Sequence, residues 1–82
     1  MQINKWGRKM KELDINIKKS IIESITRYAS ANKGYDGSLE TDLKSGFISG
    51  LWMGLISAGY KYNVEFSNVM YDVWDNAKSI YN

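Results

Sequence analysis

An acidic run starting at Asp36 is the one group of side chains in this sequence with a metal-like spacing. Its alternating oxygen-bearing residues are Asp36, Ser38, Glu40 and Asp42. This spacing matches that of the first ligands in a calcium loop of the EF-hand type. Such a loop also needs a glycine and a bidentate carboxylate at the positions where this sequence has Thr41 and Phe47. We therefore interpret the run as the acidic start of a helix, where negative charge suits the helix dipole.

Histidine and cysteine are both absent from the 82 residues. Without them the chain lacks the commonest general base, the commonest metal ligand and the thiolate nucleophile. The sequence also has no glycine loop before a Lys-Ser or Lys-Thr pair and no nucleophile-elbow pattern. Its carboxylates are scattered over positions that we expect to face solvent. We therefore predict that the protein is not an enzyme and holds no metal or cofactor.

Positive charge is concentrated in the first part of the chain. Residues 1–33 hold eight lysines and arginines against three acids, a net charge of +5, whereas residues 34–82 have a net charge of −3. The basic side chains that could bind an acidic partner are Lys5, Arg8, Lys9, Lys11, Lys18 and Lys19. One hypothesis is that they bind nucleic-acid phosphates, in which case affinity would fall steeply with salt. The alternative is a solvated basic helix face.

Three glycines at intervals of four residues lie in an uncharged stretch. On a helix, Gly46, Gly50 and Gly54 would form one smooth ridge. An interior glycine costs a helix up to about 1 kcal/mol relative to alanine, so three of them indicate close approach of another backbone. That backbone could belong to this chain, to a second copy or to another protein, and the sequence leaves these alternatives open. The stretch is too short and too rich in glycine and serine to span a membrane, so we expect no membrane role.

The spacing of apolar residues predicts the helices around this ridge. Intervals of three and four residues favour a short first helix over residues 2–13 and a second helix over residues 15–32. One long helix across both segments is the alternative. Asp14 favours the break, because its carboxylate can cap the second helix by accepting from a backbone N–H. Gly34 and Gly59 are suited to the left-handed conformation that ends a helix.

Two further helices are predicted after these. One covers residues 39–58 and is capped by Ser38. The other covers residues 64–81 and is capped by Asn63 or Ser67. The first of them is apolar on almost every side, which predicts that protein surrounds it. The predicted fold class is therefore all-α: a small helical bundle of one short N-terminal helix and three longer helices, with the Gly-xxx-Gly-xxx-Gly helix central.

The function expected of this bundle is binding. Aromatic residues make up 13% of the single domain that residues 1–82 would form, and exposed aromatics are common anchors of protein interfaces. The candidate interface residues are Trp6, Gly46, Gly50, Gly54 and Tyr71. We therefore predict a non-enzymatic, cytoplasmic module that binds a protein target stoichiometrically as a small regulator or inhibitor, with a homo-oligomer as one possible assembly. Its richness in Asn, Lys, Ile and Tyr suggests a phage or other mobile element as its origin.

Overall fold

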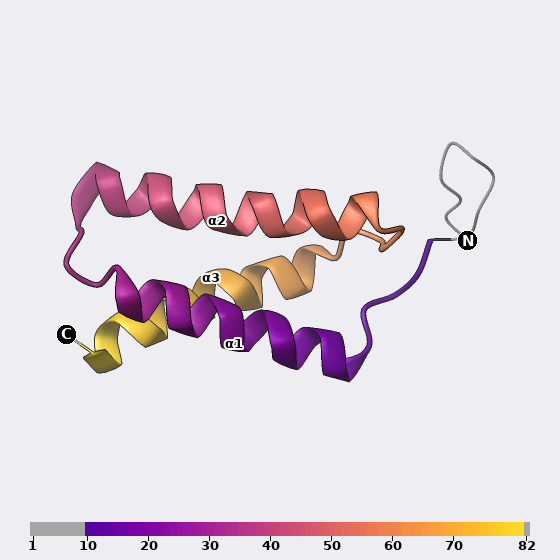
Figure 1. Cartoon of the computed structure of the whole chain (residues 1–82), viewed down its shortest axis with the longest axis horizontal. Helices are drawn as coiled ribbons and strands as arrows, with labels where there is room; N and C mark the ends of the chain where they lie inside the picture. Colours follow the sequence, from indigo (N-terminus) through magenta and orange to yellow (C-terminus); the bar gives the residue numbers. More distant parts are fainter. Residues whose placement is uncertain (1–9, 82) are drawn as a thin grey trace.

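The computed structural model describes residues 10–81, with side chains placed for residues 10–79. Within this range the chain forms three helices, namely α1 (Ile15–Ala31), α2 (Gly37–Ser57) and α3 (Val64–Tyr81) (Figure 1). The prediction of an all-α fold is confirmed. The three longer helices lie within two residues of their predicted bounds.

The chain before α1 is extended, so the prediction of a short helix over residues 2–13 is wrong in its last part. Its first part lies outside the described residues. The Lys11 amide donates to the Gly59 carbonyl at 2.8 Å, and the Lys61 amide donates to the Lys11 carbonyl at 2.8 Å. A helix would engage these groups within its own turns, whereas the extended chain pairs them with the segment that follows α2. The side chain of Leu13 enters the core beside this pairing.

For each of the three helices, one end is formed by the residue that the sequence predicted. The Asp14 carboxylate accepts a hydrogen bond of 2.9 Å from the Ile17 amide at the start of α1. Because Asp14 has extended backbone (ψ 171°), one long helix through this residue is excluded. The Asn63 side chain accepts from the Phe66 amide at 3.0 Å and so caps α3. Gly59 follows α2 with a φ of 96°, as predicted.

The connection between α1 and α2 differs from the prediction. Gly34 does not adopt a positive φ, and α1 ends instead at Asn32, whose amide donates back to carbonyls of the last turn. The left-handed residue is Gly37, with a φ of 59°, at the first position of α2. The N-cap position of α2 is therefore Asp36 and not Ser38. In the connection between α1 and α2, Gly37 is therefore the glycine whose left-handed backbone conformation allows the turn.

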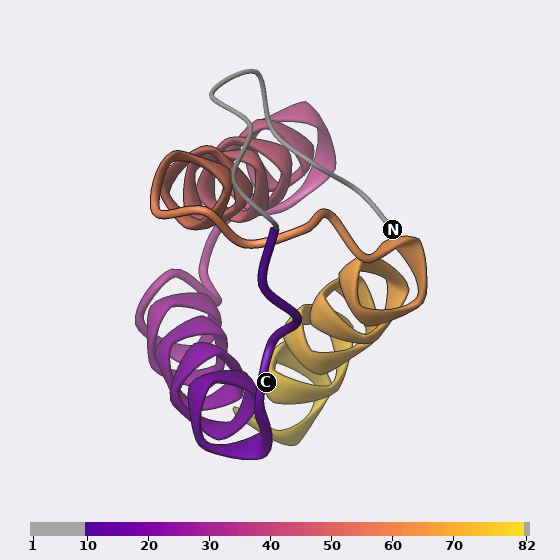
Figure 2. The same ribbon diagram turned by 90° about the vertical axis from the view of Figure 1, so that its right-hand side faces the viewer.

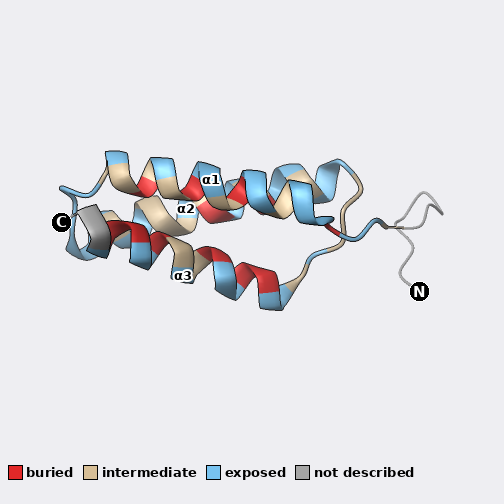
Figure 3. Cartoon of the chain, turned by 90° about the horizontal axis from the view of Figure 1, so that it is seen from below, coloured by how far each residue is buried: buried red, intermediate tan, exposed pale blue. Residues whose placement is uncertain are grey.

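Seen along its length, the bundle is triangular, with one helix at each corner (Figure 2). α1 and α3 pack closest to each other, and their buried residues line the sides that face inward (Figure 3). The core contains Leu13, Ile21, Ile25, Ala29, Ile48, Trp52, Phe66, Met70, Trp74 and Ala77. All three helices thus contribute to one hydrophobic cluster.

α2 contributes less to this core than its apolar sequence predicts. Ile48 and Trp52 are its buried residues. Phe47 stacks on Tyr28 of α1 with 4.3 Å between ring centroids, and its centroid lies 6.5 Å from that of Trp74 in α3. These large rings separate the α2 backbone from the other two helices. The prediction that α2 is central in the bundle is therefore wrong, because the described chain leaves the far side of α2 exposed.

A lysine from α3 holds the start of α2 in place. The Lys78 ammonium lies 2.6 Å from the Glu40 carboxylate and also donates to the Tyr35 carbonyl. Residue Lys78 is only 8% exposed, so its charge is compensated almost entirely by these two acceptors. The pair joins α2 and the α1–α2 connection to the C-terminal part of α3.

We predict that Glu40→Gln destabilises the protein by about 1–3 kcal/mol near neutral pH, because it removes a charge-assisted hydrogen bond. The hydrogen bond from Lys78 lowers the pKa of the Glu40 carboxyl below its usual value of 4.5. The stabilisation is therefore fully present above about pH 4.5 and is lost as the pH falls through the lower pKa of the folded protein. Urea unfolding at about pH 7 and about pH 3 measures this difference.

Arg27→Gln is the matched control, because it removes an ion pair with Glu23 that is exposed on both sides. It should leave the free energy of unfolding almost unchanged at both pH values. An equal effect of Glu40→Gln at neutral and acidic pH would contradict the assigned role of the Glu40 charge.

Candidate protein interface

The acidic run at the start of α2 has a structural role in the fold. Glu40 is engaged by Lys78, and Asp36 occupies the N-cap position without a side-chain hydrogen bond to the helix. Among the described residues, no three carboxylates gather in a way that could hold a metal ion. These residues therefore give no starting point for metal chemistry.

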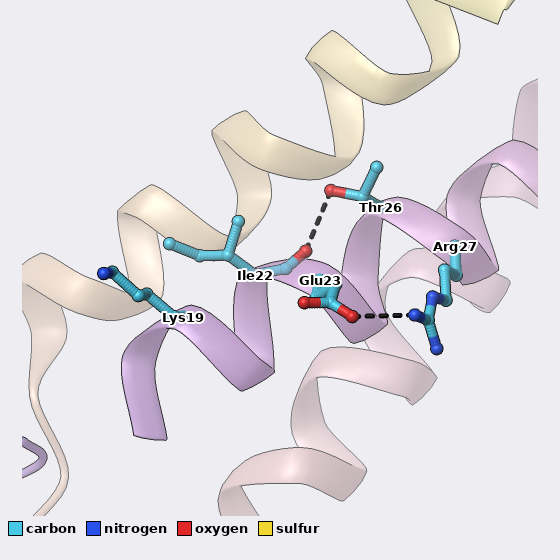
Figure 4. Close-up of a pocket in the computed structure, with 5 residues that line it drawn as sticks. All are labelled: Lys19, Ile22, Glu23, Thr26 and Arg27. Atoms are coloured by element: carbon cyan, nitrogen blue, oxygen red, sulfur yellow. Dashed lines mark hydrogen bonds and ion pairs between the residues drawn. The ribbon is translucent and has the colours of Figure 1, made fainter. Parts of the chain in front are cut away.

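A surface depression of about 530 Å³ lies along α1 and is lined by Lys19, Ile22, Glu23, Thr26 and Arg27 (Figure 4). The Thr26 hydroxyl donates to the Ile22 carbonyl at 2.8 Å, one turn earlier in the helix. Glu23 and Arg27 form an ion pair at 2.7 Å. All five side chains come from α1.

Two described members of the predicted basic patch lie over aromatic rings of the same chain. The Lys11 ammonium lies 4.4 Å from the centroid of the Tyr60 ring, and that of Lys18 lies 5.6 Å from the Phe66 centroid. Lys19 lines the depression along α1. The other three members, Lys5, Arg8 and Lys9, are outside the described residues.

The side of α2 turned away from α1 and α3 is different in character. We define the outer face of α2 as those of its exposed residues after Ser38 that lie on the side of the glycines, namely Leu39, Asp42, Gly46, Ser49, Gly50, Met53, Gly54, Ile56 and Ser57. Met53 is 70% exposed, Leu39 59% and Ile56 44%. Asp42 is the face's single charged residue. The outer face therefore combines large exposed apolar side chains with small residues and little charge.

The three glycines of this face touch neither α1 nor α3. A Cβ atom added at Gly46, Gly50 or Gly54 would meet no described atom within 4 Å. The alternative in which the ridge packs against one of these two helices is therefore wrong. The physical reason is that Ile48 and Trp52, two residues to either side of Gly50 and so on the opposite side of the helix, are the residues of α2 that enter the core. The glycines are thus left on the solvent side, at a cost to the helix of up to about 1 kcal/mol each.

The other predicted interface residues are placed differently. Tyr71 is half-buried and packs against the core, and the ammonium of Lys44 lies 6.0 Å from its ring centroid. Tyr71 therefore does not face away from the core, as the sequence suggested. Trp6 lies outside the described residues. Tyr62 is 49% exposed, but its ring contacts Trp52 edge-on with 4.7 Å between centroids.

Sequence reasoning missed the exposed residues Met53 and Ile56. Both lie in a helix that is apolar on nearly all sides, so periodicity could not tell which side is buried. The positions of the glycines were the feature of the sequence that could have shown which side of this helix is exposed. Residues three, four or seven apart share one face of a helix, and Met53 follows Gly50 by three residues and Gly46 by seven.

We predict that Gly46→Ala, Gly50→Ala and Gly54→Ala each stabilise the isolated chain by about 0.5–1 kcal/mol. The methyl group enters open space, so only the improved helix propensity remains. Denaturant unfolding at low protein concentration measures the effect without a contribution from association.

Gly37→Ala provides a control with the opposite sign. There the φ of 59° disfavours any side chain, and the substitution should destabilise the protein by about 1 kcal/mol. If alanine at Gly50 lowered stability as well, the exposed position of the ridge would be incorrect.

In the described part of the chain, none of the helices combines the length and hydropathy that crossing a membrane requires. The exposed apolar residues of α2 lie on one side of the helix, and the buried Ile48 and Trp52 lie on the other. Comparison with protein-family models, curated proteins and solved structures found no match to this chain.

Proposed function

We propose that this protein is a non-enzymatic interaction module that binds a helix of another chain on the outer face of α2. The observation that carries the proposal is the open space over Gly46, Gly50 and Gly54, flanked by exposed Met53 and Leu39. Small residues in register let a second helix approach closely, and the larger apolar residues supply surface to bury.

The energetics of the face favour a bound state. Full burial of an exposed leucine, isoleucine or methionine side chain contributes about 1.5–3 kcal/mol. Leu39, Met53 and Ile56 are all exposed in the isolated chain. Only one ionised side chain, Asp42, would have to be desolvated at the edge of such a contact. A helix docked on this face would therefore gain apolar burial at a small electrostatic cost.

The proposed mode of action is stoichiometric. A small module without catalytic residue types would regulate or inhibit a target by occupying a surface that the target needs. This part of the proposal is supported by the composition, which lacks histidine and cysteine, and the phage or mobile-element origin is supported by composition alone. Nucleic-acid binding by the basic N-terminal third is the alternative, and its signature would be a steep loss of affinity with salt.

We predict that Met53→Glu abolishes capture of a stoichiometric binding partner, whereas Val69→Glu does not. Both positions are exposed apolar residues inside helices, 70% and 41% exposed, but Val69 belongs to α3. The charge at position 53 would have to be desolvated in the contact. The measurement is affinity capture by the tagged chain in its native host, with the partner counted whether it is another protein or an untagged copy of this chain.

Circular dichroism and thermal unfolding of both variants establish that they fold. The proposal fails if no stoichiometric partner is captured, or if the two variants lose the partner to the same extent.

A further inference from the structure

We infer that the chain bound on the outer face of α2 is a second copy of this protein, with the two α2 helices antiparallel and Gly50 facing Gly50 across a two-fold axis. The inference rests on the proposed function of this face. It adds the identity of the partner and the register of the contact.

The residues of the face complement themselves in this arrangement. Gly46 and Gly54 lie four residues to either side of Gly50, so in an antiparallel pair each Gly46 faces Gly54 of the other copy. Met53 lies less than one turn beyond Gly50. Its side chain would enter the hole over Gly46 and Gly50 of the second helix, where no atom of the described chain lies within 4 Å of an added Cβ. The same contact is formed twice by symmetry.

Charge complementarity selects the antiparallel direction. Asp42 on the outer face forms no ion pair with a described residue, and the Lys11 ammonium has the Tyr60 ring but no described carboxylate beside it. The Lys11 side chain lies against Gly59, with its Cε 3.7 Å from a Cβ built at that glycine.

Asp42 precedes Gly50 by eight residues, about 12 Å along α2, and Ser57, the last residue of α2, follows Gly50 by seven residues, about 11 Å. Lys11 lies against Gly59, just beyond this end of the helix. An antiparallel pair centred on Gly50 therefore brings Asp42 of each copy toward the end of α2 at which Lys11 of the other lies. A parallel pair would place Asp42 beside Asp42. The antiparallel pair also opposes the two helix dipoles.

Single cysteines test the register directly, because the natural chain has none. A disulfide needs Cα atoms less than about 7 Å apart. Gly50→Cys should therefore cross-link to itself under mild oxidation. Gly46→Cys and Gly54→Cys should not cross-link alone, since two copies of either lie about 12 Å apart along the pair, but a mixture of the two should form the mixed dimer. Val69→Cys, on α3, is the control and should stay monomeric.

The mass of the unmodified chain in solution, measured from about 1 μM to about 1 mM, accompanies this test. The inferred pair predicts a concentration-dependent dimer that Met53→Glu converts to a monomer and Val69→Glu leaves intact.

Self-cross-linking at all three glycine positions would mean a parallel pair and would overturn the inferred register. A monomer at every concentration, without a disulfide at position 50, would overturn the second copy as partner. In that case, capture of another protein that depends on Met53 would still support the proposed function, so the two failures are distinguishable.

Discussion

The aromatic contact between Phe47, Tyr28 and Trp74 is the interaction on which the arrangement of this protein depends. The rings of Phe47 and Tyr28 are stacked with an interplanar angle of 4°, and Trp74 lies tilted against both. One ring comes from each helix, so this single layer joins α1, α2 and α3. Because the rings are large, they support α2 at a distance that small residues could not span. Ile48 and Trp52 are buried on the side of α2 opposite Gly50, so the glycine side is turned outward.

Both ends of α2 are held by contacts from distant parts of the chain. Lys78 of α3 binds Glu40 and the Tyr35 carbonyl at its start. At its end, Lys11 pairs with the backbone of Gly59 and Lys61. A helix fixed at both ends presents its outer face in one orientation, and such preorganisation reduces the conformational entropy that a partner must overcome on binding. The outer face of α2 is therefore exposed and also positioned.

The outer face has the composition that a helix–helix contact requires and an isolated monomer does not. Exposed glycines weaken the helix, and an exposed methionine and leucine add apolar surface to solvent. Both features have a physical reason if another helix covers them. The charge distribution agrees with this view, because Asp42 at one end of the face and Lys11 beyond the other lack an oppositely charged partner among the described residues.

The sequence by itself determined the helices and most of their ends, because these depend on local interactions. Apolar spacing set the three long segments, and Asp14, Asn63 and Gly59 act where local hydrogen bonding and backbone conformation require them. It also identified the glycine ridge, but it could not say which side of α2 is buried, since that helix is apolar almost all round. Only the tertiary structure decided this, because α1 and α3 bury Ile48 and Trp52, which lie on the side of α2 opposite Gly50. It likewise decided that Lys11 lies in extended backbone, because its partners at Gly59 and Lys61 are almost fifty residues away in the chain.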